Sequence, residues 1–258
     1  MKVQMLLKKL LKLLPFLISM RGYAEYIHYS QIHPAQLSFS SKDVQSKIDE
    51  AIQEGHAFWN TTTKSWEFKH YAGQSIFAEK KQLAVVKAAC GYVLLDGHHK
   101  VLASIKLGAY WINVKIVQDL TVMDENQFWH EAETKNWADL YSVYGTRAIP
   151  PKRFEDMQDD PYRWLPFLLK GVVPENNDMS KYKGVEYPVW IKIGDGVPFI
   201  EFKIAKALFK NGIKYSYEMG DNLSIEFVEQ CRSILLNENI VGLFVVPNRV
   251  HYSQVILK

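Results

Sequence analysis

A seven-residue stretch, LLDGHHK at residues 94–100, combines residue types that suit phosphate chemistry. An apolar, strand-like run ends at Asp96, Gly97 permits a turn, and a helical pattern begins with two adjacent histidines. The start of a helix presents unpaired backbone N–H groups and a partial positive charge, so it favours an anion such as phosphate. A carboxylate beside a phosphate can hold a metal ion or accept the proton of an attacking hydroxyl, and histidine exchanges protons near neutral pH. The candidate catalytic residues are Asp96, His98 and His99, and the candidate binding residues are Gly97 and Lys100.

Each of these side chains also has a purely structural interpretation. Asp96 can act only as a helix cap, and Lys100 can simply be solvated. One histidine can be a half-buried side chain with satisfied hydrogen bonds, because adjacent residues on a helix point about 100° apart. The spacing alone favours a functional site and leaves these alternatives open.

A second cluster of charged residues is formed by the segment DDPYR, residues 159–163, together with Glu201. An arginine beside carboxylates can complete a phosphate pocket or a metal site. The structural alternative is that Asp160 caps a helix start while Arg163 pairs with a nearby acid such as Glu201. We favour the structural role for this cluster, since buried arginine–acid pairs often serve architecture instead of catalysis.

The first site depends on a strand–turn–strand–helix–strand unit. Residues 82–88 and 92–95 are apolar and β-like, and Cys90-Gly91 between them forms a turn. Residues 98–107 have the pattern of a helix that ends at a glycine, and residues 111–117 are rich in β-branched side chains. The DGHHK sequence therefore lies where the second strand passes into the helix.

The rest of the chain contributes further helices and strands. A helix is expected over residues 42–54, with Ser40 or Ser41 as its cap. The other expected elements are an extended segment at 26–36, helices at 124–145, 199–210 and 224–237, a loop-like region at 172–198, and strands at 241–246 and 251–257. Together they predict an α+β body with a helical lobe after residue 120.

Composition restricts the class of protein. With 258 residues, 48% apolar and 23% charged, the chain is neither a collagen, a coiled coil, a disordered chain nor a polytopic membrane protein. The 31 basic and 28 acidic residues give a net charge of +3. Five basic and no acidic residues fall within residues 1–24, so the remaining 26 basic and 28 acidic residues give −2. The body's bulk charge therefore gives no support to long-range attraction of nucleic acid, and no strong basic surface is expected outside the N-terminus.

Residues 1–24 have the features of a targeting element. Lysines lead, an apolar stretch follows, and Gly22-Tyr23-Ala24 supplies small residues for a signal peptidase. The alternative is an amphipathic helix on a surface, because leucines and lysines fall on opposite faces at helical spacing. The expected location is periplasmic or secreted if this segment is cleaved, and cytoplasmic otherwise. Cys90 and Cys231 accordingly form one disulfide bond or stay thiols.

The segment LAVVKAACGYVLLDGHHKVLASIKLG, residues 83–108, resembles the central part of the ParB/sulfiredoxin-like superfamily. It is most similar to the group of ParB-like nucleases, with their strand, glycine turn, second strand and Asp-x-His-His signature. Four further segments resemble that group in the same order: IHPAQLSFSSKDVQSKI at 32–48, Phe128-Trp129, DDPYR at 159–163 and FIEFKIA at 199–205. The resemblance covers about residues 26–210 and implies a mixed sheet with helices.

The superfamily binds phosphate-bearing nucleotides where the strand meets the helix: ParB proteins bind CTP and DNA, sulfiredoxins use ATP, and a related branch phosphorylates free serine. Gly97 and His99 occupy the Gly-x-His part of its phosphate motif. Lys100 stands where many members have arginine, so charge is kept but bidentate contact is lost. Gln36 stands where the serine-kinase branch has a catalytic glutamate, and an amide cannot act as a base. Sulfiredoxins need a cysteine beside this motif, but none lies between residues 91 and 230, and Cys90 falls in the preceding turn. No ParB helix-turn-helix is evident after residue 120.

The resemblance and the residues together predict a ParB-like nuclease or phosphohydrolase that binds a nucleotide or nucleic acid at DGHHK. Asp96 is the expected base or metal ligand, and a histidine the acid or phosphate clamp. The expected ligand-binding residues are Gly97, Lys100, Gln36, Asp160, Arg163 and Glu201. Mg²⁺ or Mn²⁺ could accompany the nucleotide. The alternatives are a nucleotide-dependent small-molecule kinase and a non-catalytic binding or interaction module.

The expected division of the chain has three parts. Residues 1–24 form the signal peptide or amphipathic segment, and residues 1–20 of it could contact a membrane. Residues 25–120 form the ParB/sulfiredoxin-like core. Residues 121–258 form a helical extension that ends in strands and packs on this core.

Overall fold

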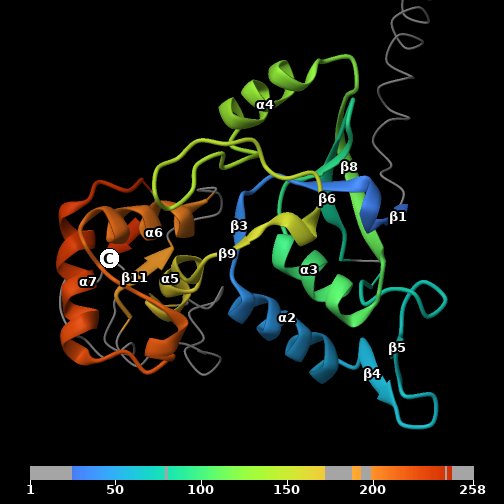
Figure 1. Ribbon diagram of the computed structural model, residues 1–258, viewed down its shortest axis with the longest axis horizontal. Helices are drawn as coiled ribbons and strands as arrows, with labels where there is room; N and C mark the ends of the chain where they lie inside the picture. The colour runs from blue at the N-terminus through green and yellow to red at the C-terminus, as the bar shows by residue number, and fades with distance from the viewer. Residues whose placement is uncertain (1–24, 79–80, 172–187, 193–198, 242, 246–258) are drawn as a thin grey trace, which may run out of the picture.

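The computed structural model describes residues 25–78, 81–171, 188–192, 199–241 and 243–245. The expected targeting segment 1–24, the expected strand 251–257 and most of the loop-like region 172–198 lie outside these residues. Figure 1 shows two lobes side by side, one formed by the first half of the chain and the other by the orange and red C-terminal part.

The first lobe contains a five-stranded mixed sheet. Its strands, in spatial order, are β1 (Glu25–His28), β8 (Trp111–Leu120), β6 (Leu83–Ala88), β7 (Gly91–Leu94) and β2 (Ile32–Pro34). Strand β6 runs parallel to β8 and antiparallel to β7, while β2 runs parallel to β7. The fold is α+β with a mixed sheet, as the sequence predicted.

Two helices pack side by side against this sheet. Helix α2 (Ser41–Gln53) begins where the Ser40 hydroxyl accepts the Asp43 N–H at 3.3 Å, which is the expected serine cap. Helix α3 (His98–Leu107) has the bounds that the sequence predicted. It connects β7 to β8, so its N-terminus lies at the end of a buried central strand.

Helix α4 (Glu125–Thr134) is shorter than the helix expected at 124–145. Asn136 adopts a left-handed conformation with φ of 54° just after the helix. The Trp137 N–H then donates to the Ala132 carbonyl at 2.7 Å, which closes a Schellman-type end. The expectation of a continuous helix was therefore wrong, and residues 135–153 run as an irregular connection that includes isolated bridges.

Both faces of the sheet are buried, and side-chain alternation decides which core each residue joins. Val85 and Leu94 belong to the core shared with α2 and α3. Val86 and Val93, one position away, belong to the core shared with α4. A strand covered on both faces is expected to be largely apolar, and this explains the apolar character of β6 and β7, which Lys87 interrupts near the end of β6.

The C-terminal lobe has its own core, which contains Trp190, Leu165 and Leu208. Its elements are a 3₁₀ turn η3 (Pro161–Arg163), α5 (Leu165–Leu168), β10 (Lys170–Gly171), β11 (Trp190–Lys192), α6 (Ile200–Lys210), a 3₁₀ turn η5 (Tyr217–Met219), α7 (Ile225–Asn237) and β12 (Leu243–Val245). The three strands form a small sheet in the order β10-β11-β12. Strand β11 lies within the region expected to be loop-like.

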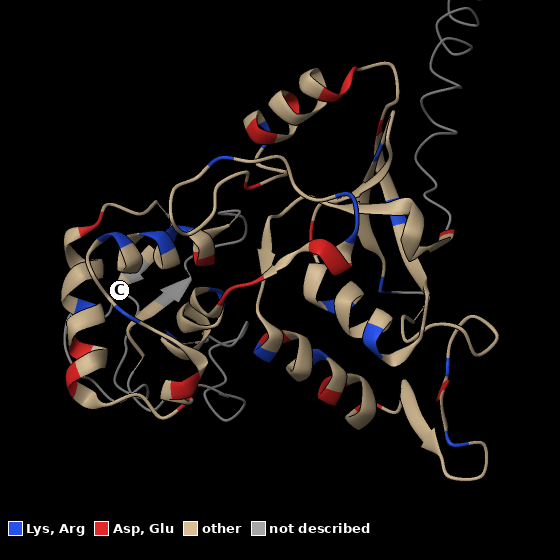
Figure 2. Ribbon diagram, viewed as in Figure 1, with Lys and Arg blue, Asp and Glu red and all other residues tan. Residues whose placement is uncertain are grey.

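Short elements complete the molecule. Strand β3 (Ser38–Phe39) pairs with β9 (Gln158–Asp159) between the two lobes (Figure 1). The hairpin of β4 (Ala57–Asn60) and β5 (Ser65–Phe68) follows α2. Acidic and basic residues are interspersed along α2 and α7, whereas α4 carries acidic residues and no Lys or Arg (Figure 2). Among the described helices, none has the length and apolar character needed to cross a membrane.

Candidate functional site

A cavity of about 580 Å³ lies between the α2–α3 pair and the beginning of the C-terminal lobe. Cavities of roughly 300–1,000 Å³ are typical of small-molecule sites. Eight of the nine candidate residues line it: Gln36, Asp96, Gly97, His98, His99, Lys100, Arg163 and Glu201. The fold thus brings the two sequence clusters, at residues 94–100 and 159–163 with Glu201, to one cavity.

The N-terminus of α3 opens on this cavity without a side-chain cap. Gly97 is the N-cap residue, and its φ of 88° lies in the left-handed region that favours glycine. A Cβ at this position would lie 2.8 Å from Cδ2 of Leu83, which also lines the cavity. The first N–H groups of an α-helix have no intrahelical acceptor, so those of His98 and His99 remain available to an anion.

His98 is almost fully buried, with 2% of its surface exposed. Its Nε2 accepts the backbone N–H of Ala35 at 2.9 Å, so the proton of the neutral ring is on Nδ1. Burial lowers the pKa of His98 well below its usual value, and electrostatic interaction with His99 and Arg163 lowers it further. His98 is therefore a neutral side chain whose buried Nδ1–H has no partner among the described residues.

His99 connects α3 to the beginning of α2. Its Nε2 accepts the backbone N–H of Ser40 at 3.1 Å, and its Nδ1 lies 2.7 Å from Oδ2 of Asp43. Burial alone raises the pKa of Asp43, but the hydrogen bond and charge of His99, with smaller contributions from Lys47 and Arg163, leave that pKa below its usual value. Both ring nitrogens of His99 are therefore occupied by protein groups.

Asp96 and Lys100 flank the two histidines. Asp96 is exposed at the cavity wall, and its Oδ1 accepts the N–H of Gly97 at 2.7 Å. Lys100 is half-buried and forms no ion pair with a described residue. The cavity wall therefore presents the exposed carboxylate of Asp96 and the ammonium group of Lys100 to a ligand.

Arg163 enters the cavity from η3 in the opposite wall. Its guanidinium stacks on the ring of Phe202, with Cζ 3.0 Å from the ring centroid. The Nε and Nη1 atoms are buried and have no hydrogen-bond partner among the described residues. Burial lowers the pKa of Arg163 to about 10, while Glu201 and Asp160 act in the opposite direction, so the group stays charged at neutral pH.

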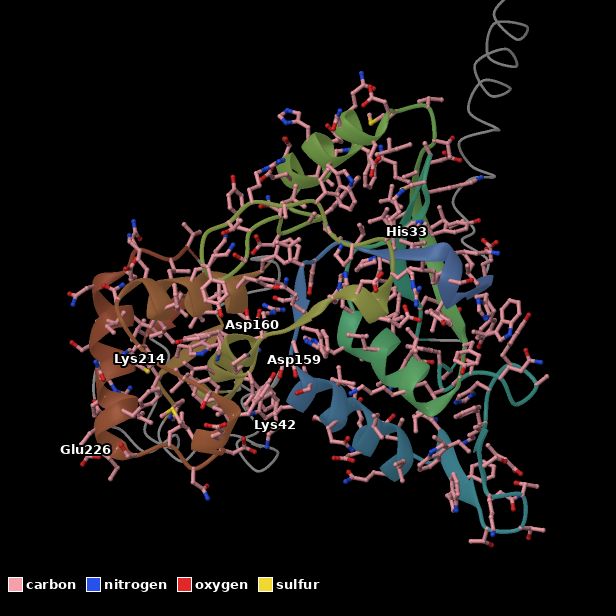
Figure 3. The ribbon with its side chains drawn as sticks, viewed as in Figure 1. His33, Lys42, Asp159, Asp160, Lys214 and Glu226 are labelled. Atoms are coloured by element: carbon pink, nitrogen blue, oxygen red, sulfur yellow. The ribbon has the colours of Figure 1, made fainter. Side chains whose placement is uncertain are left out.

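The expected ion pair between Arg163 and Glu201 does not form. Glu201, in the first turn of α6, instead contacts Nζ of Lys170 at 3.2 Å. Asp160 does not line the cavity: its Oδ1 accepts the Tyr162 N–H at 3.0 Å and caps η3, as the structural interpretation of this segment has it. Figure 3 shows Asp160 beside Asp159 at the junction of the two lobes. Burial raises the pKa of Asp160.

Several residues of the wall were not found from sequence. Asp43 and Lys47 come from α2, while Phe199 and Phe202 come from the beginning of α6. Asp43 is the third residue of α2, so the predicted cap at Ser40 was the sequence signal that could have drawn attention to it. Its pairing with His99 depends on tertiary packing and has no sequence signal. Phe199 has a φ of 57°, a conformation that is uncommon for a bulky residue.

Among the described residues, no group of three or more His, Cys, Asp or Glu side chains is arranged to hold a metal ion. Of the carboxylates in the cavity wall, Asp43 is bonded to His99 and Glu201 to Lys170. Asp96 is the carboxylate that remains for a metal ion brought by a ligand.

A protein-family model described as "Putative ParB-like nuclease" matches residues 26–192. The chain belongs to this family. The matched span includes the DGHHK junction and the DDPYR segment, while the wall residues Phe199, Glu201 and Phe202 lie beyond it. The resemblance noted in the sequence is confirmed.

The crystal structure of protein Atu1540 from Agrobacterium tumefaciens is similar to this chain, with a TM-score of 0.54 and 19% sequence identity. The alignment covers 81% of this chain and 90% of that chain. At this identity the likeness shows a shared fold. The curated proteins include no match to the chain.

Proposed function

We propose that the cavity binds a phosphate-bearing ligand, a nucleotide or the end of a nucleic acid, and that the protein acts on it as a phosphohydrolase. The observation that carries this proposal is the convergence on one cavity of the uncapped N-terminus of α3, Lys100 and Arg163. A helix N-terminus and two cationic side chains around one cavity favour an anion.

Three groups around the cavity would share the phosphate. The N–H groups at the start of α3 are neutral donors, while Lys100 and Arg163 are charged donors from opposite walls. Hydrogen bonds between charged groups and phosphate are short and strong, and arginine adds a bidentate geometry. The site therefore suits a phosphate group better than a neutral ligand.

The proposed reaction is attack of water on the phosphorus atom. Asp96 accepts a proton from the attacking water, the new P–O bond forms, and the bond between phosphorus and the ester oxygen breaks. The leaving oxygen takes its proton from solvent. Arg163 and Lys100 stabilise the charge that develops on the remaining phosphate oxygens.

Mg²⁺ or Mn²⁺ bound with the ligand would neutralise part of the phosphate charge, and Asp96 is the wall carboxylate that would hold it.

A second candidate function is binding without catalysis, and the histidines favour it. His98 is held neutral with Nε2 on the Ala35 N–H, and His99 has both ring nitrogens occupied. Neither imidazole is therefore placed to transfer a proton to a ligand, and Asp96 alone would have to do so. The two functions share the ligand and differ only in turnover.

The binding proposal is tested with Lys100→Ala and the matched control Lys106→Ala, because both lysines belong to α3 and Lys106 lies exposed in its last turn. We expect Lys100→Ala to weaken binding of tripolyphosphate and of nucleoside triphosphates about tenfold, since a charge-assisted hydrogen bond contributes roughly 1.5–3 kcal/mol. Isothermal titration of the full chain measures this. Equal affinities for the two variants would contradict a phosphate site at the start of α3.

Turnover separates the two candidate functions. Under the hydrolase proposal, Asp96→Asn keeps nucleotide affinity and lowers phosphate release at least ~100-fold, the scale of a lost general base. Asp156→Asn, an exposed carboxylate outside the cavity, is the control. Nucleotide binding by the wild-type chain without phosphate release, with Mg²⁺ or Mn²⁺ present, would establish the non-catalytic alternative.

A further inference from the structure

His33 in β2 contacts two backbone carbonyl groups through the two nitrogens of one ring. Its Nδ1 lies 2.7 Å from the carbonyl oxygen of Lys152, and its Nε2 lies 2.7 Å from the carbonyl oxygen of Cys90. Both distances are at the short end of the range for hydrogen bonds between nitrogen and oxygen. The ring, labelled in Figure 3, thus joins the turn between β6 and β7 to the irregular connection at residues 135–153.

Both contacts require a proton on the ring nitrogen. A carbonyl oxygen only accepts hydrogen bonds, whereas a neutral imidazole has one donor nitrogen and one acceptor nitrogen. In a neutral ring, the lone pair of one nitrogen would therefore face a carbonyl oxygen at 2.7 Å. A flipped ring would place carbon atoms at these positions, but C–H···O contacts are about 3.3–3.6 Å long. The doubly protonated, positively charged ring is the form that satisfies both carbonyl groups.

Gly91 leaves room for this ring beside the turn. Its φ of 132° is a conformation that favours glycine, and a Cβ at this position would lie 2.9 Å from Nε2 of His33 and 3.1 Å from the carbonyl oxygen of Gln31. Strands β2 and β7 pair in parallel with His33 opposite Val93, so the sheet itself holds the ring near the turn. A side chain at position 91 would displace the ring from the carbonyl group of Cys90.

Carbonyl oxygens, and not an acid, hold the charge of the ring. Among the described residues, no carboxylate lies within ion-pair distance of His33. Burial raises the pKa of the Cys90 thiol, so this thiol is uncharged at neutral pH. The titratable and charged groups on the elements around the ring are Tyr29, Cys90, Glu125, Lys152, Arg153 and Glu155. Of these, Glu155 already accepts the Tyr29 hydroxyl at 2.9 Å and lies 3.6 Å from Arg153. No neighbouring acid therefore replaces a carbonyl contact that His33 loses on deprotonation.

Both segments that the ring joins lead to the cavity. Two residues after His33, the Ala35 N–H donates to Nε2 of His98 at 2.9 Å. On the other side, the connection passes into a 3₁₀ turn, η2 (Phe154–Asp156), and the ring of Phe154 lies 6.1 Å from the ring of His98. The same segment continues through β9 to Arg163 in the opposite wall. The contacts of His33 therefore lie at the point from which both segments enter the cavity walls.

We infer that His33 is a pH-sensitive clamp between these two segments. Its doubly protonated ring ties the β6–β7 turn to the connection at Lys152, and loss of one proton releases one of the two carbonyl groups. In the unfolded chain a histidine is mostly neutral at pH 7, so the folded chain holds an extra proton there. The stabilisation is present while the ring is protonated and is lost as rising pH removes that proton. The clamp forms without a ligand, so the inference is independent of the proposed phosphate chemistry.

The test records the ring nitrogen signals of the ¹⁵N-labelled full chain by NMR at pH 7. Both nitrogens of His33, assigned through its own Cβ, should resonate as protonated, pyrrole-type nitrogens. A neutral ring instead gives one pyridine-type nitrogen, and this pattern in the wild-type chain would overturn the inference.

Two glycine variants separate the contact from backbone strain. Gly91→Ala should convert His33 to the neutral pattern at pH 7, because the added methyl group displaces the ring. Gly55→Ala is the control: its φ of 67° is also positive, but its Cβ would meet nothing within 4 Å, so His33 should stay doubly protonated. A doubly protonated ring that persists in Gly91→Ala would equally overturn the inference.

Urea unfolding supplies a second measurement. Glutamine at position 33 can donate to one carbonyl group but does not titrate. The unfolding midpoint of wild type should exceed that of His33→Gln at pH 6, and the difference should shrink as the pH is raised to 9. His130→Gln, at an exposed position of α4, is the matched control and should give a curve parallel to that of wild type. Parallel curves for wild type and His33→Gln would contradict the clamp, and the NMR test decides the matter if His33→Gln does not fold.

Discussion

The hydrogen bonds of His98 determine its chemistry. Because Nε2 accepts from a backbone N–H, protonation of that nitrogen would break the bond to Ala35 and place a charge in a buried position. The lowered pKa of His98 follows from this burial. A histidine of this kind is a neutral hydrogen-bond donor across the physiological pH range, and it differs from the acid–base role expected from the DGHHK sequence.

The same burial predicts how stability depends on pH. In the unfolded chain His98 takes up a proton near pH 6.5, whereas in the folded chain its pKa is well below that value. Below about pH 6.5 the unfolded state therefore binds more protons, and the free energy of unfolding falls with a contribution of up to about 1.4 kcal/mol per pH unit. Above pH 6.5 this contribution to the slope disappears.

His98→Gln tests this pH dependence, because glutamine can still accept the Ala35 N–H but does not titrate. Urea unfolding of wild type and variant should be measured at pH 8, 7, 6 and 5. The variant is less stable at pH 8, since packing is disturbed, and the difference should shrink steadily between pH 6.5 and 5. Parallel stability curves for the two proteins would contradict a buried neutral His98.

At the scale of elements, α3 is bounded by two glycines in the left-handed conformation, Gly97 at its start and Gly108 at its end. A Cβ on Gly97 would lie 2.8 Å from Leu83 Cδ2, while a Cβ on Gly108 would meet nothing within 4 Å. Alanine at Gly108 therefore tests backbone strain alone, whereas alanine at Gly97 tests backbone strain together with contact with the cavity wall.

Gly97→Ala and Gly108→Ala should each lower the free energy of unfolding by about 1–2 kcal/mol, the cost of a left-handed non-glycine residue. Because the methyl group of Gly97→Ala displaces the flexible end of Leu83, which lines the cavity, we expect only this variant also to weaken the proposed binding of nucleoside triphosphates. Denaturant unfolding and titration calorimetry measure the two effects. Equal loss of affinity in both variants would show that the cavity does not depend on the Gly97–Leu83 contact.

Local signals predicted α2 and α3 to within one residue at each boundary. The serine before α2 and the glycine after α3 determine helix ends only a few positions away, so these boundaries can be predicted from sequence. The helix expected at 124–145 failed because Asn136 turns left-handed, a choice that periodic aromatic residues do not reveal. The β4–β5 hairpin was missed because its aromatic and polar sequence has no clear alternation.

The candidate site was predictable only in part. The hydrogen-bond donors at the start of α3 could be predicted, because the strand, the glycine and the helix that create them follow one another in the sequence. The partners of the site residues come from distant segments. His99 contacts Ser40 and Asp43, and Glu201 contacts Lys170 instead of Arg163. The unpaired guanidinium of Arg163 depends on the packing of the second lobe, so no sequence pattern could indicate it.

At the scale of the whole molecule, the cavity has one wall in each lobe, and the beginning of α2 joins them. The Tyr217 hydroxyl donates to Oδ1 of Asp159 at 2.6 Å and accepts the Ser41 N–H at 3.2 Å. Lys42 lies 3.8 Å from Asp221 at the same junction, and Figure 3 shows Lys42 and Asp159 where α2 meets the C-terminal lobe. Burial, and then the bond to Asp159, raise the pKa of Tyr217 to about 12, so the hydroxyl stays protonated at neutral pH.

Removal of this hydroxyl should loosen the junction while leaving the two cores intact. In Tyr217→Phe, the Ser41 N–H loses one of its two acceptors and Asp159 loses a donor, at a cost of about 1–2 kcal/mol. Amide hydrogen exchange should therefore be roughly tenfold faster in the first turn of α2 and at residues 217–221, with β6 and β8 unchanged. Tyr144→Phe, at a ring that is 64% exposed, is the control and should leave all these amides unchanged. Equal acceleration of the β6 and β8 amides would mean that Tyr217 supports the fold as a whole instead of the junction between the cavity walls.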